Sequence, residues 1–120
     1  MNREIKFRIW DKANRQFILL EDLYWFEENY VHSFNDENFV FQQYTGLKDK
    51  NGREIYEGDI VKYSWLSYYN EANEDIGEVY FEDGIFYFDR EMSFATNDGN
   101  FIKESIEVIG NICENPELLK

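Results

Sequence analysis

The apolar pattern around Asp83-Gly84 constrains the fold of this chain more than any other feature. Asp-Gly is a favoured two-residue hairpin turn, because both positions of that turn require positive φ. With the turn there, the flanking runs place three pairs opposite each other: Val79 and Phe88, Tyr80 and Tyr87, Phe81 and Phe86. One face is then wholly apolar and the other mostly polar, so residues 78–89 predict a β-hairpin with one buried face.

Similar patterns elsewhere predict a mainly β fold. Alternation over residues 5–10, a turn at 11–14 and a strand at 17–20 indicate an N-terminal hairpin. We expect further strands at 39–45, 60–65 and 106–112, tight turns at Asn51-Gly52 and 57–59, and a loop over 66–75. Residues 21–37 fit either helical turns or an irregular strand, so an α+β arrangement of the N-terminal part stays open.

The chain has 120 residues, the usual length of one domain, so we expect a single domain over 1–120. Five or more short strands joined by turns indicate a small barrel or a sandwich. Its core is predicted to contain Ile60, Val79, Phe81, Phe86, Phe88, Val108 and Ile112.

Residues that carry catalytic or metal chemistry are scarce. The chain has one histidine and one cysteine, His32 and Cys113, and neither a nucleophile elbow nor a phosphate-binding glycine loop. The segment Asp49–Gly52 faintly resembles a calcium loop, but the first and last ligand positions would hold Leu47 and Gly58. We therefore expect no enzyme activity, no cofactor and no metal, with a carboxylate-based hydrolase using acids near 71–83 as the weaker alternative.

The charge of the chain bears on its partners and its location. Twenty-five acidic and 12 basic residues give a formal net charge of −13, which disfavours direct binding to nucleic acid or to an anionic membrane. The first residues are too charged for a signal peptide, and no apolar run has the length of a transmembrane helix. A lone cysteine fits a reducing compartment, so the expected location is the cytoplasm.

Three ordered blocks carry a family resemblance: residues 3–11, 44–61 and 108–119. Together they resemble the YopX-like proteins of bacteriophages and prophages. The resemblance implies a bacterial host cell, with an SH3-like small barrel over 44–120 that follows an N-terminal hairpin or irregular part over 1–43. It implies no activity and no catalytic residue.

Two acidic stretches that lack Lys and Arg, residues 16–47 and 63–89, are also rich in aromatic residues. Acids beside Tyr and Trp suit a docking site for a basic protein. The leading hypothesis is therefore a non-catalytic protein-binding module with an acidic aromatic face; the alternative is a structural or assembly role with self-association. The candidate partner-binding residues are Trp65, Tyr68, Tyr69, Glu74, Asp75, Glu78, Tyr80, Glu82 and Tyr87.

Overall fold

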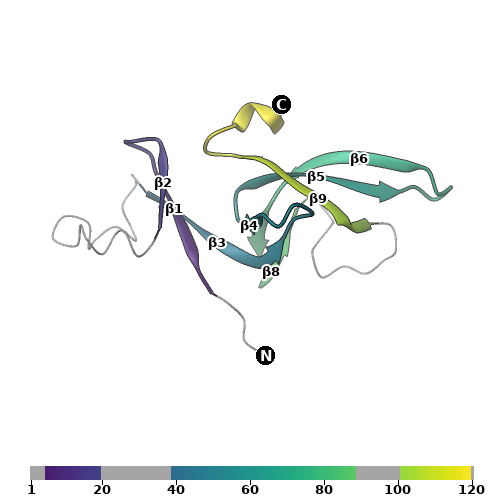
Figure 1. Ribbon diagram of the computed structural model, residues 1–120, viewed down its shortest axis with the longest axis horizontal. Coiled ribbons are helices and arrows are strands. Elements are labelled where there is room, and N and C mark those ends of the chain that lie inside the picture. Colours follow the sequence, from purple (N-terminus) through teal and green to yellow (C-terminus); the bar gives the residue numbers. More distant parts are fainter. Residues whose placement is uncertain (1–4, 20–38, 89–100, 120) are drawn as a thin grey trace.

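The computed structural model describes residues 5–19, 39–88 and 101–119, and these residues confirm the predicted mainly β fold (Figure 1). The strands are β1 (Phe7–Asp11), β2 (Gln16–Leu19), β3 (Phe39–Lys48), β4 (Glu54–Tyr56), β5 (Asp59–Leu66), β6 (Ala72–Glu78), β7 (Tyr80–Glu82), β8 (Ile85–Tyr87) and β9 (Phe101–Asn111). A short 3-10 helix, η3, follows at Pro116–Leu119.

The N-terminal hairpin forms as predicted and belongs to a four-stranded sheet of order β2-β1-β3-β4. Its turn is held by Asp11, whose carboxylate accepts hydrogen bonds from the backbone amides of Ala13 and Asn14 at 3.0 and 3.3 Å. Strand β3 pairs first with β1, over Phe39–Gln43, and then with β4, over Tyr44–Lys48. This one strand therefore links the N-terminal hairpin to the later part of the chain.

The second sheet has the order β6-β5-β9, with β5 in the centre. The expected loop over residues 66–75 is wrong in its second half, because β6 begins at Ala72 and pairs with β5 along its whole length. Alternation was hidden there because acidic residues occupy both faces of the strand. The ladder between β5 and β9 contains two register shifts, which let the sheet bend.

The predicted register of the 78–89 hairpin is confirmed for two of its three pairs, since Tyr80 pairs with Tyr87 and Phe81 with Phe86. The third pair, Val79 with Phe88, is not part of the ladder, and the Val79 amide instead donates to the Asp59 carbonyl. The prediction that Phe81 lies in the core was wrong. Its ring packs against Phe86 at 4.8 Å, yet 46% of the residue is exposed. Strands β7 and β8 form a separate two-stranded sheet, and Phe81 lies in its outer part.

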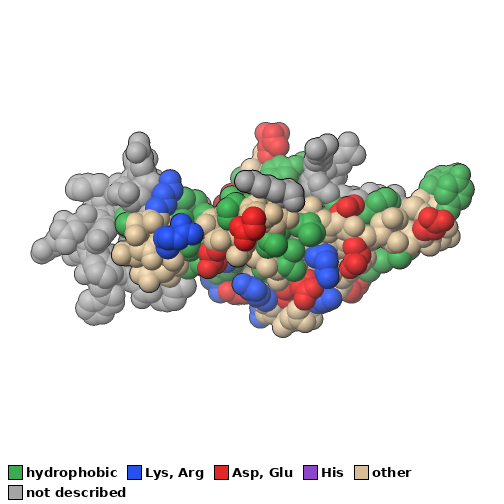
Figure 2. All heavy atoms as spheres, turned by 90° about the horizontal axis from the view of Figure 1, so that it is seen from above, with side chains coloured by type: hydrophobic (Ala, Val, Ile, Leu, Met, Phe, Trp, Pro, Cys, Tyr) green, Lys and Arg blue, Asp and Glu red, His purple; other side chains and the backbone are tan. Residues whose placement is uncertain are grey.

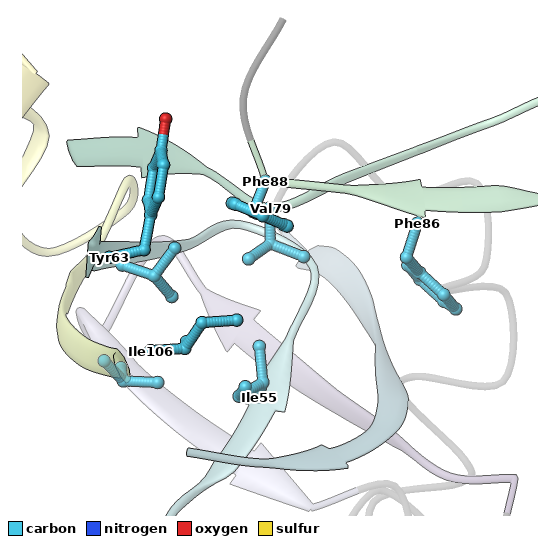
Figure 3. Close-up of a cluster of buried hydrophobic side chains, with 8 residues drawn as sticks. Ile55, Tyr63, Val79, Phe86, Phe88 and Ile106 are labelled. Carbon is cyan, nitrogen blue, oxygen red and sulfur yellow. The ribbon is translucent and has the colours of Figure 1, made fainter. Parts of the chain in front are cut away.

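The core lies between the sheets and draws on β4, β5, β8, β9 and the β6–β7 junction (Figure 3). Four of the predicted members, Val79, Phe86, Phe88 and Val108, belong to it, together with Ile55, Val61, Tyr63 and Ile106. Tyr63 packs edge-on against Phe88 at 4.8 Å. Ile60 is fully buried as expected, whereas Ile112 is only half-buried because it lies beyond the end of β9.

The alternative of helical turns over residues 21–37 lies outside the described residues, as does His32. In the described ranges, no helix has both the length and the hydropathy that crossing a membrane requires.

Candidate functional site

The β5–β6 hairpin projects from the body of the molecule and carries most of the candidate residues (Figure 1). Its turn is built around Ser67, whose backbone amide donates to the carbonyl of Glu71 at 2.8 Å. The Ser67 hydroxyl also accepts hydrogen bonds from the backbone amides of Tyr69 and Glu71. Asn70 supplies the positive φ of 61° that closes the turn.

Two tyrosines form the tip of this hairpin. Tyr68 and Tyr69 are 93% and 81% exposed, and their rings meet edge to face at 5.5 Å. Figure 2 shows apolar and acidic side chains together at this end of the molecule. Large aromatic side chains held in the solvent by an ordered turn are typical anchor residues of protein interfaces.

The acidic residues of β6 do not share one face. In an antiparallel ladder, paired residues lie on the same face, and Glu74 and Glu78 pair with Ser64 and Ile60. Asp75 pairs with Tyr63 and therefore lies on the opposite face, where its carboxylate accepts a hydrogen bond of 2.7 Å from the Trp65 indole. The predicted acidic surface is thus divided, with Glu74 and Glu78 on one face and Asp75 on the other, beside Trp65.

The carboxylates of Glu74 and Glu78 differ in their surroundings. Glu74 is exposed and lies 3.9 Å from the Lys62 ammonium group. Glu78 is half-buried, and this burial raises the pKa of its carboxyl group. Strand geometry separates their Cα atoms by roughly 13 Å.

The remaining candidates lie on β7 and β8. Tyr80 and Tyr87 stack at 5.2 Å with an interplanar angle of 17°, and Glu82 is exposed one pair further along the same face. The structure therefore brings the aromatic candidates together in pairs, Tyr68 with Tyr69 and Tyr80 with Tyr87, on two separate hairpins.

A buried polar network forms a second site, which the sequence did not reveal. Asp59 is 1% exposed, Gln42 is 2% exposed and Asn111 is 3% exposed. The Arg8 guanidinium forms a salt bridge with the Asp59 carboxylate, and its Nε donates to the Gln42 side chain at 2.9 Å. The Asn111 amide donates to both Gln42 and Asp59 at 3.2 Å.

Aromatic rings and the backbone complete this network. The Arg8 guanidinium lies 4.3 Å from the ring centre of Phe17 and 4.5 Å from that of Tyr56. The second oxygen of Asp59 accepts a hydrogen bond from the backbone amide of Tyr56 at 2.7 Å. Strands β1 to β5 and β9 thereby meet at one point. Its buried charges and amides are mutually satisfied, so the network holds the two larger sheets together.

Only one signal in the sequence could have located this network. Arg8, Asp59 and Asn111 belong one each to the three family blocks at 3–11, 44–61 and 108–119. Polar residues inside otherwise apolar strands gave no hint that they would meet. Their convergence gives the three separated blocks a common structural role.

These features define the class: a small, acidic, mainly β protein whose two larger sheets are joined by a buried polar network. The chain belongs to the YopX protein family, which it matches over residues 6–120. The expected kinship with YopX-like proteins of phages and prophages is thereby confirmed.

Two similar proteins extend this comparison. The SPbeta prophage-derived uncharacterized protein YopX of Bacillus subtilis (strain 168) is 36% identical over 73 residues, which are 58% of this chain and 52% of that protein. The chain thus spans about half the length of that relative. The crystal structure of protein EF1440 from Enterococcus faecalis superposes with a TM-score of 0.63 and 27% identity, covering 99% of this chain and all of the other.

Proposed function

We propose that this chain is a non-catalytic accessory protein of a phage or prophage that binds a basic protein partner through its β5–β6 hairpin. The observation that carries the proposal is the ordered, projecting tip with Tyr68 and Tyr69 exposed beside Glu71 and Glu74. Aromatic anchors supply contact area, and the surrounding carboxylates attract a basic surface over distance. Lys62, which lies 3.9 Å from Glu74, is the only basic residue between 54 and 89, so the acidic residues of this stretch outnumber the basic ones.

We further propose a barrel type for the fold and a cellular location for the protein. The arrangement of β4, β5, β8 and β9 around one core supports an SH3-like barrel over 44–120. We also propose the cytoplasm of the bacterial host as the site of action. Neither part is needed for the binding test below.

The test is affinity capture from producing cells, with the full chain as bait and mass spectrometry as readout. We expect a specific basic protein that is retained at low salt and lost as the salt concentration rises. Replacing both tip residues, Tyr68→Ser with Tyr69→Ser, should abolish capture, because the anchors are removed while the fold is untouched.

A charge-matched pair of variants separates the hairpin from general acidity. Glu71→Gln with Glu74→Gln should weaken capture, whereas Glu114→Gln with Glu117→Gln, which removes the same charge near η3, should not. Recovery of only the bait itself at every salt concentration would favour the structural, self-associating role instead. Equal capture by the tip variant and by the parent chain would place the binding surface elsewhere.

A further inference from the structure

The outer edge of the second sheet is formed by β6, and along this edge the described residues supply no neighbouring strand (Figure 1). Residues 72–76 are exposed except for the half-buried Asn73. The short helix η3 lies against β6, and the following residues Gly77 and Glu78 are less exposed. The open part of the edge is therefore Ala72–Ile76.

Hydrogen bonds at the two ends of the β5–β6 ladder identify which backbone groups face outward. The Ser67 amide donates to the Glu71 carbonyl at the turn, and the Val79 amide donates to the Asp59 carbonyl at the far end, both at 2.8 Å. Bonded pairs alternate along an antiparallel ladder, so residues 73, 75 and 77 direct their backbone groups toward β5. Ala72, Glu74 and Ile76 consequently direct theirs away from the sheet.

The position of Ser64 supports this assignment. Ser64 pairs with Glu74, and its backbone amide donates to the Ser105 hydroxyl of β9 at 2.8 Å instead of bonding to β6. The pair is therefore a non-bonded one, and the backbone of Glu74 faces the open edge.

The side chains along this edge define what could pair with it. Glu74, Ile76 and Glu78 lie on one face, with Ile76 43% exposed between the two carboxylates. Two copies of β6 joined antiparallel around Ile76 would place Glu74 opposite Glu78 of the second copy. A parallel pair in register would align identical acids. Both arrangements are repulsive, so the edge opposes pairing with itself and suits a strand of positive charge.

We propose that β6 binds an extended basic segment of the partner protein by strand addition, with basic side chains at positions i and i+4 and an apolar one at i+2. The added strand forms main-chain hydrogen bonds with Glu74 and Ile76. Its main chain pairs with Ala72–Ile76, one basic residue faces Glu74 and the apolar residue packs on Ile76. The second basic residue lies past the open part of the edge, on the side of the half-buried Glu78. This inference rests on the proposed function and specifies the binding mode and the chemistry of the partner.

The test uses the full chain and a short synthetic peptide containing Lys-Thr-Val-Thr-Lys, with affinity measured by calorimetry and contacts by amide chemical shifts. We expect binding that weakens with salt and shifts centred on residues 72–78. The matched control is the same peptide with N-methyl groups on the amides that face β6, which keeps every charge but removes the strand hydrogen bonds. It should bind about tenfold more weakly.

A change in the protein tests the same hydrogen bond from the other side. Ile76→Pro removes an outward N–H without removing a bond to β5, a position where edge strands tolerate proline. It should weaken peptide binding about tenfold relative to Ile76→Thr. Unchanged amide chemical shifts of β5 would show that the fold of the Ile76→Pro variant is intact. If these shifts change, the comparison of the plain and N-methylated peptides on the parent chain tests strand addition instead.

Failure of this inference and failure of the proposed function are distinguishable. Equal affinity for the plain and N-methylated peptides, or no binding of either, would overturn strand addition. A captured partner that is lost with Tyr68→Ser and Tyr69→Ser but retained by Ile76→Pro would overturn strand addition and leave the proposed function standing.

Discussion

Arg8 shows how much a single side chain contributes when it lies between the two sheets. Its charge neutralises Asp59, its Nε bonds to Gln42, and its guanidinium packs on Phe17 and Tyr56. Among the described residues, every buried side-chain nitrogen or oxygen has a hydrogen-bond partner. Removing one member therefore leaves others unsatisfied, and the cost exceeds that of one lost contact.

We expect Arg8→Ala to lower the free energy of unfolding by about 3–5 kcal/mol, because it leaves the Asp59 carboxylate buried without a counter-charge. Urea denaturation followed by circular dichroism measures the change. Arg8→Lys, which keeps the charge but loses the planar stacking, should fall between Ala and the parent chain. Lys12→Ala removes the same charge from an exposed turn and serves as the control. An equal effect of Lys12→Ala and Arg8→Ala would contradict this role of the network.

Gly58 lies next to Gln42 of the same network. It has φ of 83°, and a Cβ atom there would lie 2.3 Å from the amide nitrogen of Gln42. Gly52 has the same φ, but a Cβ atom there would meet nothing within 4 Å.

The two glycines form a matched pair of substitutions. Gly52→Ala should cost about 1–2 kcal/mol for the left-handed backbone alone. Gly58→Ala should cost about 1–3 kcal/mol more, because Gln42 must also move away from its partners. Equal urea midpoints for the two variants would show that the network adapts without loss.

At the scale of the elements, the sequence predicted the strands and turns better than the side chains' surroundings. Both hairpins that it identified are present, as β1–β2 and β7–β8, because an alternating pattern and a turn signal are local properties. The exposed fraction of Phe81 and the presence of strand β6 depend on which sheet lies above or beside a strand. No local pattern contains that information.

The candidate site shows the same limit. Exposed tyrosines at a polar turn could be predicted from composition, and Tyr68 and Tyr69 are indeed at the tip of a hairpin. The division of Glu74 and Asp75 between two faces required the pairing of β6 with β5. The network of Arg8, Gln42, Asp59 and Asn111 required contacts across up to 69 positions of the chain, the separation of Gln42 and Asn111.

The turn between β3 and β4 is fastened to β9 by Asp49. Burial raises the pKa of Asp49, but hydrogen bonds from the backbone amides of Val108, Arg53 and Asn51 outweigh it, so the pKa lies below its ordinary value of 3.8. All three bonds measure 2.9 Å. A depressed pKa in the folded state stabilises the fold above the unfolded pKa, and this contribution is lost as the pH falls through the folded pKa.

Asp49→Asn should therefore lower the free energy of unfolding by roughly 2–3 kcal/mol at neutral pH, because an amide cannot accept all three bonds. The difference from the parent chain should shrink as the pH falls below about 4. Urea titrations across this pH range measure it. Asp83→Asn changes an exposed carboxylate, so its free energy of unfolding should differ from that of the parent chain by a small amount that stays constant with pH. A gap between Asp49→Asn and the parent chain that stays constant with pH would contradict the assignment.

At the scale of the whole molecule, charge dominates. A net charge of −13 on 120 residues means that most charges repel, and the ion pairs in the described ranges, apart from Arg8–Asp59, are at the surface. Surface pairs contribute little to stability. Self-repulsion is therefore the larger electrostatic effect on folding.

We expect the urea midpoint to rise as sodium chloride is added from low ionic strength to about 0.3 M, because screening weakens this repulsion. Sodium sulfate would also act through preferential exclusion, so chloride is the appropriate salt. A falling midpoint would mean that attractive pairs outweigh the repulsion. Light scattering along the same series would report any accompanying self-association.

The shared strand β3 has a practical consequence for anyone who wishes to shorten the chain. A fragment that starts at residue 44 keeps the half of β3 that pairs with β4 but discards the half that pairs with β1. It also discards Gln42 and Arg8, so the Asp59 carboxylate would be left in an apolar interior with Asn111 as its remaining side-chain partner. Division of the chain at residue 44 would give two fragments, each without strand partners that the other fragment holds. A useful deletion has to leave β1 and all of β3 in place.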